Sequence, residues 1–131
     1  MLTNQELSKL MYQKLAGSGL DPKDASVLGM KPLRAVEALS LGFPAKASGI
    51  LIPYFTLKGA KTSFARIRYL EDTRHGFELQ TTKKPLRYGQ RANTVNELYL
   101  PPLTDWVRIA QATEIPLLIT EGEFKSACAT K

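Results

Sequence analysis

Residues 49–70, GILIPYFTLKGAKTSFARIRYL, decide the fold that the sequence predicts. The run 49–57 is rich in β-branched and aromatic residues, KGAK at 58–61 supplies a turn, and 62–70 alternates between the two faces of a strand. Two such runs joined by a short glycine-containing turn predict a β-hairpin.

The alternation of the second strand assigns its side chains to two faces. One face carries Phe64, Arg66 and Arg68, and the other carries Ala65, Ile67 and Tyr69. Two arginines two residues apart on one face lie about 6–7 Å from each other, close to the phosphate spacing along a single nucleic-acid strand.

Helices are predicted on the N-terminal side of this hairpin. Thr3 and Glu6 fit a capping box ahead of apolar residues at helical spacing, and glycines at 17 and 19 end that helix. Asp21 and Pro22 fit the cap and first position of a second helix that reaches about residue 28. A third helix is predicted over about 33–41, so residues 1–43 are expected to form a compact three-helix unit.

On the C-terminal side the pattern changes from loop to α/β. We expect loop and short strand over 77–91, a short strand at 97–100, a helix capped by Thr104 over 104–112, a buried strand at 116–120 and a helix from 122 to 130. The predicted class is α+β: an N-terminal helical unit (1–46), a basic α+β segment with a small antiparallel sheet (47–114), and the first strand and helix of an α/β element (115–131).

Composition excludes several classes of protein. The 131 residues are 44% hydrophobic and 23% charged, as in an ordinary globular domain. No apolar run approaches the roughly 18–20 residues of a membrane helix, and the N-terminus lacks the layout of a secretory signal. Cys128 is the only cysteine, which excludes an internal disulfide and a thiolate zinc site. We therefore expect a cytoplasmic protein with no membrane partner.

The positive charge is concentrated in the middle of the chain. Residues 57–91 carry nine Lys or Arg against three Asp or Glu, a balance of +6 that equals the net charge of the whole chain. Such a segment suits a polyanionic partner, because each phosphate it neutralises releases condensed counterions. A solvated basic surface without a partner accounts for the same charge equally well.

Two acidic residues, Glu121 and Glu123, surround a glycine where the predicted buried strand meets the last helix. A carboxylate at this place faces the crevice where open α/β sheets bind ligands, so Glu121 could hold Mg²⁺ or act as an acid or base on a phosphoester. The alternative is that one of these residues only caps the helix, where negative charge is favourable.

The segment LLITEGEFKSACA (117–129) resembles the opening strand, turn and helix of a toprim domain, the fold shared by bacterial-type primases and topoisomerases. It is most similar to the variant of phage, plasmid and mobile-element primases. GILIPYFTLKGAKTSFARIRYL resembles the hairpin that opens the primase catalytic core, and KKPLRYGQRANTVNELYLPP (83–102) resembles the stretch leading into toprim. The three blocks occur in the family's order and cover about residues 49–131.

The resemblance implies roles for particular residues. Glu121 corresponds to a catalytic acid and metal ligand, with Mg²⁺ as the cofactor of the complete enzyme. The best contacts to a single-stranded DNA template are Arg66, Arg68, Arg87 and Tyr88, with Tyr88 able to stack a base. Supporting positive charge comes from Lys61, Lys83, Lys84 and Arg91.

Three features depart from the family pattern. Lys125 stands where the standard primases have an aspartate, the later Asp-x-Asp pair of toprim does not occur in this sequence, and one cysteine and one histidine cannot build the zinc ribbon of cellular primases. Because one carboxylate holds Mg²⁺ poorly, we do not expect catalysis from residues 1–131 alone.

Two functions therefore follow from the sequence. The first is the N-terminal segment of a primase-like DNA replication protein, with a helicase domain or protein as a further partner. The alternative is a small phage or plasmid accessory or inhibitor protein that binds nucleic acid or a host protein without catalysis.

Overall fold

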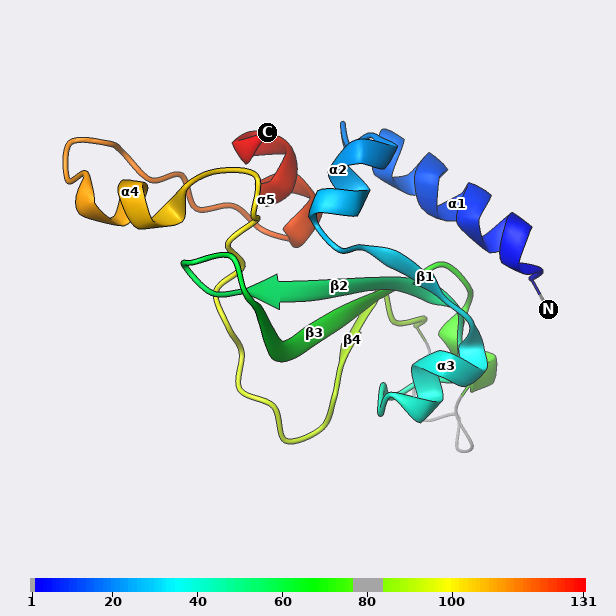
Figure 1. Cartoon of the computed structure of the whole chain (residues 1–131). Helices are drawn as coiled ribbons and strands as arrows, with labels where there is room; N and C mark the ends of the chain where they lie inside the picture. The colour runs from blue at the N-terminus through cyan, green and yellow to red at the C-terminus, as the bar shows by residue number, and fades with distance from the viewer. Residues whose placement is uncertain (1, 77–83) are drawn as a thin grey trace.

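The computed structural model describes residues 2–76 and 84–131 and is a mixed α+β fold (Figure 1). Within these residues there are five α-helices and a four-stranded sheet in which neighbouring strands are antiparallel and follow the order β1-β2-β3-β4. No helix of the described residues is both long and apolar enough to cross a bilayer. The α+β class predicted from the sequence is confirmed.

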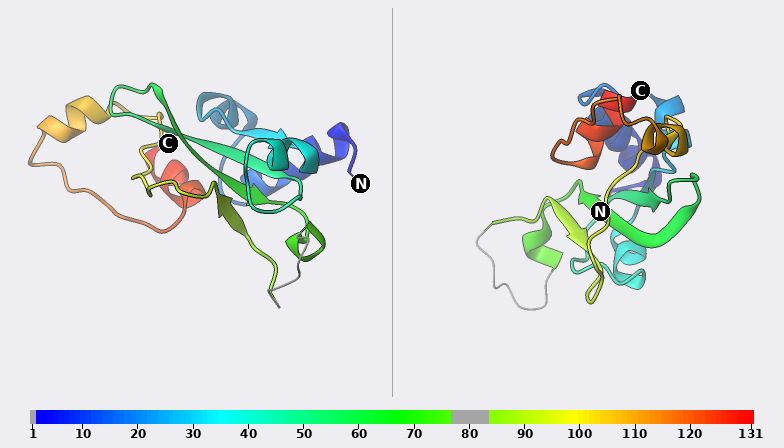
Figure 2. Two further views of the ribbon diagram at one scale, coloured as in Figure 1. Left: turned by 90° about the horizontal axis from the view of Figure 1, so that it is seen from below. Right: turned by 90° about the vertical axis from the view of Figure 1, so that its left-hand side faces the viewer.

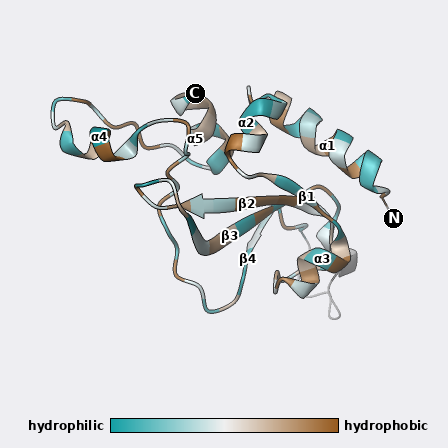
Figure 3. Cartoon of the chain, viewed as in Figure 1, coloured by the Kyte–Doolittle hydropathy of each residue, from teal (hydrophilic) through white to brown (hydrophobic). Residues whose placement is uncertain are grey.

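The predicted hairpin forms the centre of the sheet. β2 (Gly49–Phe55) pairs with β3 (Lys61–Tyr69), and Ile50 and Ile52 lie opposite Arg68 and Arg66. Thr56 and Ala60 close the turn with a 2.8 Å backbone hydrogen bond. In Figure 3 brown is prominent along β2, whereas β3 shows teal as well as brown, as its alternating polar and apolar residues require.

Two further strands complete the sheet at its edges. β4 (Tyr88–Gln90) adds to β3, and the short strand predicted within 77–91 is confirmed there. β1 (Lys31–Leu33) adds to β2 and was not predicted, because three residues containing a proline carry almost no periodic signal. Its position is physically reasonable, since proline is tolerated in an edge strand.

The three predicted N-terminal helices are present, and the first two begin where capping predicts. α1 (Asn4–Ala16) and α2 (Pro22–Val27) each start with a complete capping box, in which Thr3 pairs with Glu6 and Asp21 pairs with Asp24. These reciprocal bonds satisfy amide groups that a helix start otherwise leaves without partners. α3 (Ala35–Ser40) follows β1. The three helices do not form the expected compact three-helix unit, because α3 packs on the other face of the sheet from α1 and α2.

The sheet has a hydrophobic core on each face. On one face Ile50, Ile52, Tyr54 and Phe64 pack with residues of α1, α2 and α5 (Glu123–Thr130). On the other face Ala65, Ile67 and Tyr69 pack with residues of and following α3. Figure 1 shows this division, with α1, α2 and α5 on one side of the sheet and α3 on the other. The alternation predicted for β3 is therefore confirmed.

Two predicted strands are wrong. Residues 97–100 and 116–120 have no regular structure, and three apolar residues of the second segment are 69–88% exposed. A strand requires a neighbour for its backbone hydrogen bonds, and neither segment pairs with β1 or β4, the edge strands of the sheet on the described chain. A strand-like sequence without a pairing partner does not form a strand.

The last two helices differ slightly from their predicted bounds. α4 (Trp106–Gln111) is capped by Asp105, whose side chain accepts the Arg108 amide, and not by the predicted Thr104. α4 and the segment after it extend away from the sheet (Figure 2). α5 returns to the sheet and begins after Gly122, whose φ of +79° is in the left-handed region that suits glycine.

Candidate functional site

A cleft of about 550 Å³ lies beside the β3–β4 edge, between the end of α1 and the start of α5. Five cationic side chains and two carboxylates line it: Lys14, Arg66, Arg68, Arg87 and Lys125, with Glu121 and Glu123. Residues far apart in the sequence thus form one predominantly positive surface. Such a surface attracts an anion.

Strand register brings the arginines together. Arg66 and Arg68 point to the same face of β3, and their partners on β4 are Gln90 and Tyr88. The guanidinium carbons of Arg66 and Arg68 lie over the Tyr88 ring at 4.9 and 5.2 Å from its centroid. These distances are within the range of cation–π attraction, so the Tyr88 ring holds both guanidinium groups at the cleft.

Arg68 is also fixed by the backbone. Its Nη1 donates to the carbonyl oxygens of Tyr69 and Arg87, each at 3.1 Å. Burial, with a smaller effect from the Glu123 charge, raises the pKa of the Tyr88 hydroxyl, which stays protonated at neutral pH. The two strands therefore present a fixed positive edge with a neutral aromatic ring.

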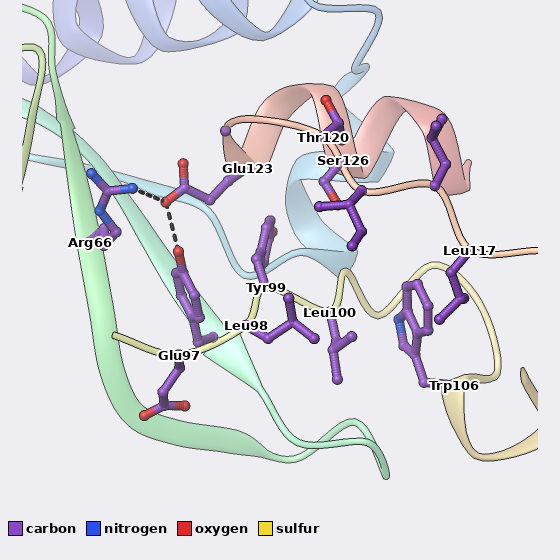
Figure 4. A pocket seen from close by; sticks show the side chains of 14 residues that line it. Arg66, Glu97, Leu98, Tyr99, Leu100, Trp106, Leu117, Thr120, Glu123 and Ser126 are labelled. Atoms are coloured by element: carbon purple, nitrogen blue, oxygen red, sulfur yellow. Dashed lines mark hydrogen bonds and ion pairs between the residues drawn. The ribbon is translucent and has the colours of Figure 1, made fainter. Parts of the chain in front are cut away.

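Glu123 is the carboxylate that enters the interior. It is 1% exposed, and its Oε1 accepts from Arg66 Nη1 at 3.0 Å and from the Tyr54 hydroxyl at 2.8 Å (Figure 4). Burial and the Glu123 charge raise the pKa of Tyr54 above its ordinary value, so this hydroxyl remains a donor. Among the described residues, Glu123 Oε2 and Arg66 Nε are buried without a hydrogen-bond partner.

Glu121 has a different environment. It is exposed and lines the cleft, and its carboxylate makes no hydrogen bond or ion pair within the described chain. The glycine between the two glutamates turns the backbone so that one carboxylate stays at the surface and the other is buried. From the sequence, these glutamates could face a ligand or could only stabilise the start of the last helix. The structure places Glu123 in the first turn of α5.

The predicted contact residues divide into two groups. The first group lines the cleft and consists of Arg66, Arg68, Arg87, Tyr88 and Glu121. Three other predicted residues lie elsewhere: Lys61, Lys84 and Arg91. Lys83 falls outside the described residues.

Strand geometry explains why these residues separate. Arg91 is an odd number of positions after Tyr88; its guanidinium lies 5.4 Å from the centroid of the Phe43 ring, and it donates to the Ser63 carbonyl at 3.0 Å. Phe43 belongs to the core on the opposite face of the sheet. Lys61 stands five residues before Arg66, a distance of about 16 Å along a strand.

Sequence reasoning missed two cations of the cleft, Lys14 and Lys125. Lys14 is in the last turn of α1, where a lysine is ordinarily explained by the helix dipole. In the sequence, Lys125 stands out only as a departure from the primase motif. Neither has a local signal, because the docking of α1 and α5 on the sheet determines their positions.

Two carboxylates line the cleft, and only that of Glu121 has no partner among the described residues. Within residues 2–76 and 84–131 there is no group of three His, Cys, Asp or Glu side chains that could hold a metal ion. Glu121 supplies one free carboxylate, and Glu123 is occupied by Arg66 and Tyr54. Mg²⁺ in a protein is usually held by one or two carboxylates together with waters and substrate phosphates, so we derive no metal-dependent step from these residues alone.

Comparison of the chain with protein-family models, with curated proteins and with solved structures found no match.

Proposed function

We propose that this chain binds single-stranded nucleic acid in the cleft, as the N-terminal segment of a primase-like replication protein acting in the cytoplasm. The proposal rests on one observation: the same cleft is lined by Arg68, Arg87 and Tyr88 and by the turn that carries Glu121. The three basic-segment residues are more than 30 positions from Glu121 in the sequence, and all four residues belong to the blocks that resemble primases.

Phosphate contacts supply most of the binding in this proposal. Arg68, Arg87, Lys14 and Lys125 are the cleft cations without a carboxylate partner among the described residues. A phosphate chain that runs along the β3–β4 edge meets the first two and passes between α1 and α5. Affinity should then fall steeply with salt, as counterion release requires.

Tyr88 contributes less to nucleic-acid binding than the sequence suggests. Two guanidinium groups lie over its ring, so a nucleobase that stacks there competes with them. We assign Tyr88 the role of positioning Arg68, whose guanidinium contacts the phosphate. Sequence-independent binding follows, since no contact in this scheme reads a base edge.

The test is binding of fluorescently labelled oligo(dT) by anisotropy over a range of KCl concentrations. Arg87→Ala should weaken binding and flatten the salt dependence, while Lys84→Ala, an exposed lysine outside the cleft, should change neither. If the chain fails to bind at low salt, or if both variants behave alike, the cleft is not the binding site and the proposal is abandoned.

The toprim-like element and the role of Glu121 are part of the same proposal. In the complete protein Glu121 would supply one ligand to Mg²⁺, and further carboxylates and a helicase would act with it. Template-directed primer synthesis by the complete protein tests this role. Full activity after Glu121→Gln would remove Glu121 from the catalytic residues.

A role in binding alone is the second candidate function. It is favoured by the cleft itself, where five cations meet a single free carboxylate. An accessory or inhibitor protein needs only the cations. Nucleic-acid binding by a full-length gene product that shows no Mg²⁺-dependent nucleotide incorporation would support this candidate over the enzyme.

A further inference from the structure

Residues 115–120, IPLLIT, form an apolar segment that the fold leaves uncovered. Leu117, Leu118 and Ile119 are 69%, 83% and 88% exposed. Leucine and isoleucine are ordinarily among the most buried residues, and a contiguous exposed run of them marks an interaction surface.

The backbone of this segment is open as well. Within the described chain, no hydrogen bond involves a backbone N–H or C=O of residues 116–120. The segment therefore presents apolar side chains together with free carbonyl acceptors at 116–120 and free amide donors at 117–120, since Pro116 has no N–H. This combination is what a strand edge offers to an additional strand.

The segment is loosely supported on its inner side. Cavities of about 260 and 320 Å³ lie next to it, and Leu117, Leu118 and Thr120 line both. The first cavity also contains Leu98, which is 73% exposed, and Trp106, which donates to the Pro101 carbonyl at 2.7 Å (Figure 4). The tertiary structure thus provides apolar space around the segment without filling it.

We propose that residues 116–120 accept an extended apolar segment of another polypeptide, which adds as a β-strand and carries a basic residue at each end. The charge pattern selects this occupant. Glu114 and Glu121 flank the apolar run, both are exposed, and the run itself carries no charge. Basic residues at the two ends of the incoming strand complement them.

A second copy of this chain does not fit the same pattern. If two copies paired antiparallel over 115–120, Glu114 of each would face Glu121 of the other. Parallel pairing in register would place identical glutamates side by side. Like charges directly opposite one another destabilise a strand pair, so self-pairing meets repulsion at both ends in either direction.

The inference does not depend on nucleic-acid binding by the cleft. Leu118 does not line that cleft, and it takes no part in the hydrogen bond between Arg66 and Glu123. A variant at Leu118 should therefore lose the peptide partner and keep oligo(dT) binding. This separates failure of the present proposal from failure of the proposed function.

The experiment uses three labelled peptides with blocked termini and the whole chain. The peptides are KTVIVITK, whose lysines are seven positions apart like Glu114 and Glu121, its acidic counterpart ETVIVITE, and KTVIVITK with N-methyl groups on one hydrogen-bonding edge. Fluorescence anisotropy should show that KTVIVITK binds at least about tenfold more tightly than ETVIVITE. The N-methylated peptide should not bind, because strand addition depends on backbone hydrogen bonds.

Leu118→Asp tests the surface, and Leu57→Asp is its matched control. Leu57 is 49% exposed in the turn after β2 and lines neither of the cavities beside the segment. Leu118→Asp should abolish binding of KTVIVITK and Leu57→Asp should leave it unchanged, with both variants showing the wild-type circular dichroism spectrum. Because Leu118 is so exposed, its replacement removes no core contact.

Four results would overturn the proposal. They are no binding of KTVIVITK, equal binding of the basic and acidic peptides, equal binding of the N-methylated peptide, and a dimer in sedimentation velocity that Leu118→Asp dissociates. The last result would identify the occupant as a second copy of the chain.

Discussion

Glu123→Gln should increase the affinity of the cleft for phosphate, although the substituted residue is buried. In the wild-type chain Arg66 donates to Glu123 Oε1 at 3.0 Å, so the positive charge of Arg66 is largely cancelled by this carboxylate. Glutamine keeps the size of the side chain and can still accept from the Tyr54 hydroxyl. The substitution therefore releases the charge of Arg66 to the cleft.

The expected magnitude follows from the number of free cations. Five cations line the cleft, and four remain when Arg66 is cancelled by Glu123. If each neutralises one phosphate of a single strand, the slope of log K against log salt is about −2.8 for the wild type and about −3.5 for Glu123→Gln. Arg66→Ala should stay near −2.8, and Arg87→Ala should flatten the slope to about −2.1. Glu121 is common to all four proteins and does not affect the comparison.

The assay is anisotropy of labelled oligo(dT) in a KCl series, with thermal unfolding of each variant to confirm that it is folded. The difference between two arginine variants is the informative result, because a simple count of positive charge predicts equal losses from Arg66→Ala and Arg87→Ala. Equal slopes for these two variants, or an unchanged slope for Glu123→Gln, would refute the argument that Glu123 masks Arg66.

Three further predictions concern stability. Glu123→Ala should lower the urea-unfolding free energy by about 2 kcal/mol, less than for a fully buried pair, because Arg66 is 31% exposed and water can reach it. Gly49→Ala should cost about 1–3 kcal/mol in the same assay, since a Cβ there would lie 2.6 Å from the Arg68 carbonyl oxygen; a neutral result would contradict this packing. A hydrogen bond from the Asp21 amide and, to a smaller extent, one from Lys131 lower the pKa of the Asp24 carboxyl below its ordinary value of 3.8. The stability that this carboxylate contributes is therefore fully present above its ordinary pKa and is lost as the pH falls through the folded-state pKa. The stability difference between wild type and Asp24→Asn should accordingly vanish in acid, and a constant difference would exclude this linkage.

Much of the local structure could be predicted because its causes are local. The Thr3–Glu6 capping box involves residues three positions apart, and the alternation along β3 needs only the period of a strand. The same period places Arg66 and Arg68 on one face. These features were correct because no distant residue was needed to produce them.

The strand predicted at 116–120 failed for a non-local reason. Its composition is that of a buried strand, but the hydrogen bonds of a strand belong to a neighbour elsewhere in the chain or in another molecule. β1, which has almost no pattern, became a strand because β2 offered it an edge. Pairing partners, more than composition, decided which segments joined the sheet.

The candidate site was predicted only in part for the same reason. Its arginines and Tyr88 lie on adjoining strands and could be grouped from the hairpin and the basic segment. Lys14 and Lys125 could not, since each reaches the cleft through the packing of a helix. Arg91 belongs to the same basic segment but lies over Phe43, on the opposite face of the sheet, because charge along a sequence carries no information about the two faces of a sheet.

The sequence by itself determined the helix starts, the central hairpin, the two faces of β3 and the concentration of positive charge, all of which follow from interactions between near neighbours. Only the tertiary structure decided that Glu123 would be buried against Arg66, 57 positions away, and that Glu121 would stay exposed. The physical reason is that burial of a charge requires a partner, and the docking of α5 on the sheet supplied a partner to one of the two glutamates.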